Sequence, residues 1–351
     1  MSLDLLNHLQ IIRLRAVVQQ HEAFKSAVVH HPFRAAFGLL LRPFKALLRR
    51  FRHYLRGRAL APLVVSNQPS DMLLEHGCFK LLRHVHDPQS LEIRIASASD
   101  ESCDANVFTL SNGSVRLKSG NRKLVIIHAY YEREAHKIFK LLGGFADYDL
   151  VLTTAIPSIR DEFLNRFDPQ RAACLLVPNI GRDVLAFLLV VYTLDLSSYE
   201  YFVKVHTKRS GHLADGSNWF HINIETLIGN KLMTDRLFEH IDAGQPCIYG
   251  VECLPLQDHL ENNRHWLEFL LKQPLANMDE LFVPGTMFAG SVRFLKEVAE
   301  SNFHLYQMEE EKGQLDGCLP HALERYFGYL AKVRGGECTT IENLVLRELV
   351  R

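Results

Sequence analysis

The feature that most constrains the fold is an alternation of short apolar runs with segments of helical periodicity, which begins at Lys123. The apolar runs are KLVIIHAYY (123–131), DLVLTTA (149–155), AACLLVPN (172–179) and YFVKVHTK (201–208). The helical segments between them are 132–142, 159–167 and 183–194. Strand-length runs that alternate with helices are typical of βαβ units. The pattern therefore predicts an α/β domain with a mostly parallel sheet flanked by helices.

The rest of the chain divides by its pattern of apolar and polar residues. With 351 residues, of which 47% are hydrophobic, it can form more than one domain. Residues 1–60 have the apolar spacing of helices and are basic. Residues 61–120 alternate apolar and polar residues, as short half-buried strands do. We therefore expect a basic amphipathic helical region at 1–60, a mixed segment with short strands at 61–120, and the α/β domain at 121–351.

Charge and cysteine usage narrow the class of protein. The 40 basic and 40 acidic residues balance, but residues 30–58 contain many arginines and no acidic residue. The seven cysteines form no C-x-x-C pair, which is typical of reduced thiols in the cytoplasm. We find no signal peptide and no spanning apolar run, so we expect a cytoplasmic protein that contacts a membrane at most peripherally. The neutral net charge and the absence of base-reading motifs argue against a nucleic-acid partner.

Common catalytic motifs are absent from the sequence. It contains no G-x-G-x-x-G, no Walker phosphate loop, no H-E-x-x-H and no G-x-S-x-G. Candidate functional residues are therefore sought at the carboxyl ends of the predicted strands, where ligands bind in open α/β sheets.

The first candidate group is VPNIGRD, which connects the third run to the next helix. Asn179 and Gly181 form the turn, and Arg182 and Asp183 open the helix. A glycine admits close approach of a ligand, a helix N-terminus favours an anion, and an arginine can grip a phosphate. An ordinary strand-to-helix turn, with Asp183 facing the helix dipole, explains the same residues equally well.

The second candidate group ends the fourth run. His206, Thr207, Lys208 and Arg209 follow directly on a buried strand, and they offer donors and positive charge to an anionic ligand. Taken singly, His206 is explained by a structural role and Arg209 by solvent exposure. Their combination at one strand end favours a binding site.

The third candidate group lies in QLDGCLPHALERYF (314–327). Asp316 stands just ahead of a predicted helix, on which His321, Glu324 and Arg325 share one face. A helix cap at Asp316 and an ion pair between Glu324 and Arg325 are the simpler interpretations.

One further pattern is misleading. Asp147 and Asp149 form an Asp-x-Asp, which sugar transferases use to hold a metal ion, but here the pair precedes a strand. We expect it at the opposite edge of the sheet.

Four motifs of the α/β domain, in this order and spacing, resemble the rhamnan synthesis protein F family. They are VPNIGRDVLAFL, YEYFVKVHTKRS, GTMF and QLDGCLPHALERYF, and the resemblance covers roughly residues 121–335. It implies a glycosyltransferase with a GT-A-like sheet that acts on nucleotide-activated sugars. Metal-dependent enzymes of that fold carry Asp-x-Asp where this chain has His206, Thr207 and Lys208. This departure from the pattern predicts a metal-independent site, with no cofactor beyond the nucleotide-sugar donor.

The resemblance also implies roles for the candidate residues. Lys208, Arg182 and Arg209 would stabilise the leaving diphosphate. Asp316, or as second choice Glu324, would deprotonate the acceptor hydroxyl in an inverting reaction. Tyr130, beside Tyr131, would stack on the nucleobase.

The expected partners follow from the same resemblance. The donor favoured is dTDP-rhamnose, and the acceptor is a lipid-linked cell-surface polysaccharide or O-antigen. Residues 30–58 would then lie on the cytoplasmic face of the inner membrane. The alternative is a non-catalytic glycan-binding or assembly protein. Convergence of Lys208, Arg182 and Asp316 on one site would favour the enzyme.

Overall fold

The computed structural model describes residues 3–16, four strands between 74 and 111, and residues 117–350 except 178, 180, 209–215, 261, 273, 276–277 and 302–315. The chain divides into two compact units, one of residues 1–9 with 71–351 and one of residues 10–70. The basic stretch 30–58 and Arg209 lie outside the described residues, as does a hairpin turn predicted at Asn112-Gly113. The division at residues 60 and 120 stays a prediction.

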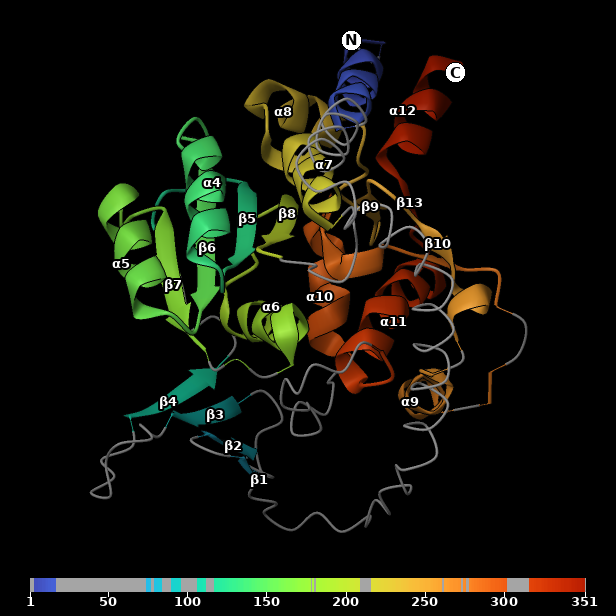
Figure 1. Ribbon diagram of the computed structural model, residues 1–351. Coiled ribbons are helices and arrows are strands. Elements are labelled where there is room, and N and C mark those ends of the chain that lie inside the picture. The colour runs from blue at the N-terminus through green and yellow to red at the C-terminus, as the bar shows by residue number, and fades with distance from the viewer. Residues whose placement is uncertain are drawn as a thin grey trace, which may run out of the picture. The chain divides into compact units, whose positions relative to one another are not determined.

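A seven-stranded sheet forms the centre of the larger unit (Figure 1). In spatial order its strands are β13 (Cys338–Thr340), β9 (Ile248–Gly250), β12 (Phe288–Ser291), β8 (Tyr201–His206), β5 (Lys123–His128), β6 (Tyr148–Thr154) and β7 (Ala172–Leu176). The neighbours β8, β5, β6 and β7 are parallel, as are β9 and β13, whereas β12 is antiparallel to both of its neighbours. The predicted α/β architecture with a mostly parallel sheet is confirmed.

Helices cover both faces of this sheet, because its strands are apolar on both sides. One face packs against α4 (Glu132–Leu142), α5 (Pro157–Arg166), α7 (Gly216–Ile228), α8 (Lys231–Glu239) and α12 (Ile341–Val350). The other face packs against α6 (Arg182–Thr193), α10 (Val292–Glu300) and α11 (Leu319–Val333).

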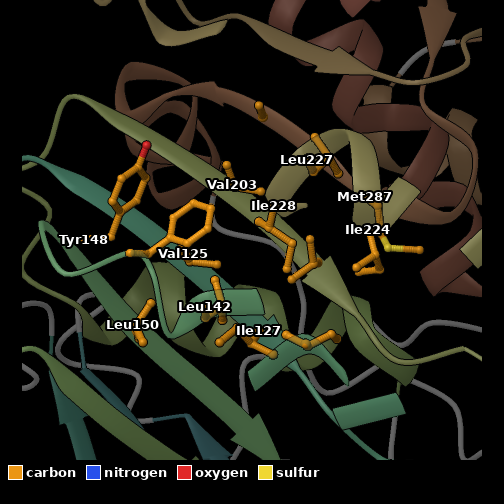
Figure 2. Close-up of a cluster of buried hydrophobic side chains, with 14 of the residues drawn as sticks. Val125, Ile127, Leu142, Tyr148, Leu150, Val203, Ile224, Leu227, Ile228 and Met287 are labelled. Atoms are coloured by element: carbon orange, nitrogen blue, oxygen red, sulfur yellow. The ribbon is translucent and has the colours of Figure 1, made fainter. Parts of the chain in front are cut away.

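Alternate residues of each strand supply the two cores. Val125, Ile127 and Val203 point into the α4 and α7 side, where Leu142 and Ile228 meet them (Figure 2). Their strand neighbours, such as Leu124, Ile126 and Phe202, belong to the other core. Buried apolar side chains drive this packing at about 25 cal/mol per Å² of area removed from water.

Local signals in the sequence start the helices. Asn230 caps α8 by accepting hydrogen bonds from the amides of Leu232 (3.0 Å) and Met233 (3.4 Å). Pro320 stands in the first turn of α11, where its missing N–H is harmless. Acidic residues stand in the first turn of α4, next to the positive end of its dipole.

Smaller elements complete the larger unit. β10 (Leu254–Pro255) and β11 (Leu281–Phe282) form an antiparallel pair, and the short helix η1 (Leu256–His259) follows β10. The short helix η2 (Pro284–Thr286) leads into β12, and α9 (Arg264–Leu271) packs beside α11. An antiparallel sheet, in the order β1 (Leu74–His76), β2 (Phe79–Arg83), β3 (Ser90–Ile95), β4 (Asn106–Ser111), occupies the segment where short strands were predicted.

The amino-terminal helix runs over residues 3–16, and its Leu5 and Leu9 join the core beside α4 and α7. None of the helices within the described residues is long and apolar enough to cross a membrane.

Candidate functional site

The carboxyl edge of the sheet brings together residues from five elements. β8 ends at His206 beside the end of β5 at His128, and α6 begins at Arg182. β12 runs in the opposite direction, so the segment that enters it, η2 with Gly285 and Thr286, reaches this same edge. The first turns of α11 supply His321 and Glu324.

A buried lysine that the sequence analysis passed over ties three of these elements together. The Nζ of Lys204, on β8, donates to Asp183 Oδ2 (2.6 Å), to the Thr286 carbonyl (2.8 Å) and to Thr286 Oγ1 (2.8 Å). The Thr286 hydroxyl donates in turn to the Asp183 carboxylate. The lysine is 1% exposed, so it uses all three ammonium hydrogens inside the protein. It therefore fixes α6, β8 and η2 relative to one another.

Asp183 is the anionic half of this network. Burial alone would raise the pKa of its carboxyl, but the charges of His206 and Lys204 and the hydrogen bonds from Lys204 and Thr286 bring that pKa well below its usual range. Asp183 belongs to the first candidate group, which was predicted to bind the anionic part of the donor. Its contacts are with Lys204 and Thr286, so within the described structure it supports the turn that carries Arg182.

His206 and Thr207 bind neighbouring backbone. His206 Nε2 donates to the Gly285 carbonyl (2.7 Å), and burial lowers the pKa of the ring. Thr207 Oγ1 accepts from the amide of Tyr130 (2.8 Å). These two residues hold the end of β5 and the η2 segment around the tip of β8.

Lys208 is the cation at this strand tip whose head group meets an aromatic ring. Its Nζ lies 4.3 Å from the centre of the Trp219 ring, a cation–π contact. Gly285 is in contact with the same ring: it has φ +73°, and a Cβ there would lie 2.4 Å from Trp219 Cη2. Only glycine fits at this position.

Glu324 is a half-buried carboxylate that faces the same segment. Its Oε2 accepts from the Gly285 amide (2.9 Å), and its Oε1 lies 3.7 Å from Arg325 Nη1. Burial raises the pKa of Glu324, against the opposing charges of Arg325 and Lys208. A carboxylate with a raised pKa is suited to take up a proton during a reaction.

Asp316 has a different environment. Its Oδ1 accepts from Asn263 Nδ2 (2.9 Å) and lies 3.5 Å from Arg325 Nη2. Burial alone would raise its pKa, but Arg325, the Asn263 hydrogen bond and the nearby His321 lower it. Asp316 is thus a stabilised anion and a weaker base than Glu324.

Arg182 reaches across to α11. Its Nη1 lies 2.8 Å from His321 Nε2, and its backbone has φ 57° directly after Gly181 with φ 62°. The left-handed conformation at a residue other than glycine is strained by about 1–2 kcal/mol, and strain of this kind gathers at functional sites.

The structure brings together Arg182, His206, Lys208, Asp316 and Glu324 around the first turns of α11, as their contacts show. It does not bring in every candidate. Asn179 is exposed in its turn, and Tyr130 is 36% exposed and packs edge-on against Tyr131 at 5.3 Å.

Asp147 and Asp149 lie at the opposite edge, as expected. β6 begins at Tyr148, so both aspartates stand at its amino end. Asp149 accepts from Tyr199 (2.6 Å) and from Asn121 (2.9 Å), and Asp147 pairs with Lys231 (2.9 Å). The Asp-x-Asp is part of the structural framework.

No three His, Cys, Asp or Glu side chains of the described residues lie where they could share a metal ion. The expectation of metal-independent chemistry stays a prediction.

Comparison with known proteins finds a family that part of this chain resembles. Residues 83–248 match the rhamnan synthesis protein F family. The resemblance predicted from the sequence is confirmed over this range, which contains the first two motifs and reaches β9. The GTMF and QLDGCLPHALERYF motifs lie beyond it. The match to the rhamnan synthesis protein F family connects the chain with polysaccharide synthesis.

Two curated relatives are each similar to about half of this chain. The uncharacterized protein WxcX of Xanthomonas campestris pv. campestris strain B100 is 30% identical over 175 residues, and WxcX of a second strain is 31% identical over 175 residues. The alignment covers 47% of this chain and 24% of each relative, so the chain spans about a quarter of their length. No solved structure matches this chain.

Proposed function

We propose that the chain is a glycosyltransferase. It transfers a sugar, with dTDP-rhamnose the favoured donor, to a lipid-linked cell-surface polysaccharide or O-antigen with inversion of configuration. The observation that carries the proposal is the grouping of two cations, Arg182 and Lys208, with the half-buried carboxylate of Glu324 at the carboxyl edge of the sheet.

In the proposal, the two cations stabilise the leaving diphosphate. When the bond between the anomeric carbon and the diphosphate breaks, negative charge develops on the diphosphate oxygens. Arg182 can donate two parallel hydrogen bonds to those oxygens, and Lys208 adds a second positive charge. Positive groups that are already in place at a developing anion contribute strongly to rate. Arg209 is proposed as a third cation.

The neighbouring residues shape the donor site. In the proposal, Asn179 and Gly181 form the turn beside the diphosphate, His206 and Thr207 hold the strand tip, and Tyr130 offers a partly exposed ring to the nucleobase.

In the proposal, a carboxylate deprotonates the acceptor hydroxyl. The acceptor oxygen attacks the anomeric carbon as the bond to the diphosphate breaks, and its proton passes to a base. Asp316 was the first candidate for this base and Glu324 the second, but the environments of the two carboxylates favour Glu324. Glu324 has the raised pKa, whereas Arg325 and Asn263 stabilise the ionised form of Asp316.

The fold supports a GT-A-like assignment. The single reversed strand β12, placed between β8 and β9, brings a loop to the edge where the parallel strands end. That loop supplies the Gly285 amide to the proposed base. In the proposal, residues 30–58 dock on the cytoplasmic face of the inner membrane, where the lipid-linked acceptor resides.

Calorimetric titration with dTDP, UDP and GDP, each with and without Mn²⁺, tests the proposal. We expect dTDP to bind without metal, and Lys208→Ala to weaken binding about 10- to 100-fold through loss of a charged contact. Lys231→Ala, a lysine at the opposite edge of the sheet, is the matched control and should bind as the wild type does. A wild-type protein that binds none of the three nucleotides would contradict the proposal and favour a glycan-binding or assembly protein.

A further inference from the structure

We infer that His321 is a positioning residue, whose neutral imidazole, protonated at Nδ1, holds the guanidinium of Arg182 at the diphosphate-binding edge. The inference rests on the proposed function and assigns to it a residue 139 positions away from the arginine.

The hydrogen bond between the two side chains determines the tautomer. Arg182 Nη1 lies 2.8 Å from His321 Nε2. A guanidinium only donates hydrogen bonds and stays charged in proteins, so Nε2 must be the acceptor. The ring proton is therefore on Nδ1. A histidinium, which has no acceptor, could not make this contact.

The second ring nitrogen has its own partner. Nδ1 lies 2.9 Å from Cys318 Sγ and 3.8 Å from Asp316 Oδ1, so the Nδ1–H donates to the sulfur with the carboxylate just beyond it. The backbone carbonyl of His321 accepts from Arg325 Nη1 (2.8 Å). These contacts hold the ring in one orientation on α11, as the second partner of a metal-bound histidine does.

The surroundings keep the ring neutral. His321 is 8% exposed, and burial lowers its pKa to about 4. The charges of Arg182 and Arg325 act in the same direction, and those of Asp316 and Asp183 oppose them. At neutral pH the acceptor on Nε2 is thus retained, and no second positive charge repels Arg182.

His321 supports Arg182 from a second helix, α11. Gly181 and Arg182 both have left-handed backbone conformations at the start of α6, so the arginine leaves the chain away from the regular helical side-chain positions. His321 instead fixes its head group from α11. A cation held in place before the ligand arrives loses less conformational freedom on binding.

A double-mutant cycle measures this action through Arg182. We expect His321→Leu to weaken dTDP binding about tenfold, whereas His321→Gln, whose carbonyl can replace the Nε2 acceptor, recovers most of it. In an Arg182→Ala background, His321→Leu should change the affinity by less than about twofold. Thermal unfolding of each variant identifies any change that comes from general destabilisation. An equal tenfold loss in both backgrounds would overturn the inference.

A second readout separates the inference from the proposed function. NMR of isotope-labelled histidine side chains reports which ring nitrogen is protonated without any ligand. We expect Nδ1–H for His321 between pH 6 and 8, and loss of the hydrogen-bond shift at Nε2 in Arg182→Ala. Protonation at Nε2, or a charged ring at pH 7, would overturn the inference even if dTDP binds. The expected tautomer in a protein that binds no nucleotide would overturn the proposed function and the ligand role of the pair, and would leave the contact as a structural one.

Discussion

The two edges of the central sheet both carry clusters of charged side chains, and they differ in how those charges are compensated. At the amino edge, Lys123 and Lys231 pair with Asp147 and Asp235 at 2.5–3.3 Å. The pKa values shift toward the charged forms: those of Asp147 and Asp235 are lowered and that of Lys231 is raised, because the ion pairs outweigh burial.

At the carboxyl edge most shifts have the opposite sense. Burial raises the pKa of Glu324 and lowers those of His128, His206 and His321, all of which disfavours the charged forms. Asp183 and Asp316, which have cationic partners, are the exceptions.

This difference distinguishes charged residues that stabilise the fold from charged residues that form a functional site. A closed set of opposite charges stabilises itself and needs no ligand. A set of groups whose charged forms are disfavoured has a capacity to exchange protons or bind ions, and such groups cluster at functional sites. By this criterion the carboxyl edge is the better candidate for a functional site, although the amino edge carries the familiar Asp-x-Asp.

The substitution Glu324→Gln is the strongest test of the difference between the two edges. The amide can still accept from the Gly285 N–H, so the structure should be kept while the base is removed. We expect kcat to fall about 10²- to 10⁴-fold with nearly unchanged donor affinity, measured by product formation and calorimetry. Asp316→Asn is the comparison variant. If it alone abolished turnover while Glu324→Gln remained active, the roles of the two carboxylates would be the reverse.

Breaking the buried pair should have the next largest effect, on stability. Lys204→Met leaves the mostly buried carboxylate of Asp183 without its cation, and we expect the free energy of unfolding to fall by about 3–5 kcal/mol in denaturant titrations. The double variant Lys204→Met/Asp183→Asn should recover part of this loss, because the stranded charge is gone. An unchanged midpoint in the single variant would show that the pair contributes no net stability.

As the pH falls, the carboxyl edge should lose its contribution to stability before the amino edge does. His128 and His321 have folded pKa values of about 4, and the unfolded value is near 6.5. Between these values the unfolded chain binds more protons, so stability is lost as the pH falls from about 6.5, by up to about 1.4 kcal/mol per pH unit for each histidine. Asp147 and Asp235 have lowered pKa values, so their ion pairs persist through this window.

Urea titrations between pH 7 and 5 measure this slope. His321→Gln should reduce it, whereas Lys231→Ala should leave it unchanged. A slope that is the same in all three proteins would remove the distinction between the edges.

The smallest expected effect is that of Lys231→Ala on stability itself. The side chain of Lys231 is 32% exposed in its ion pair with Asp147, and partly exposed pairs contribute about 0–1 kcal/mol. A loss of several kcal/mol in denaturant titrations would mean that the amino edge is far more strongly coupled than its exposure indicates.

Much of the fold could be predicted because the local pattern agrees with it. The helix expected at 132–142 is α4, and the runs at 123–131 and 201–208 contain β5 and β8. The reversed direction of β12 could not be predicted. A four-residue strand has the same apolar pattern in either direction, and its orientation depends on pairing with β8 some 80 positions earlier in the chain.

The site was predictable in its outer parts. Arg182, His206 and Lys208 stand at strand and helix ends, which the sequence marks. Lys204 was hidden, because a lysine inside an apolar strand looks like a solvent-facing residue until the opposite helix supplies Asp183. The contact of Arg182 with His321 likewise depends on α11 lying beside α6, which no local pattern specifies.

Gly285 has a consequence for anyone who would redesign this scaffold. Its carbonyl accepts from His206 (2.7 Å) and its amide donates to Glu324 (2.9 Å), so one residue connects the tip of β8 to α11. Insertions at this point would separate the two halves of the edge at once. Redesign of the proposed donor site should therefore vary the surrounding side chains and leave the length of residues 284–286 untouched.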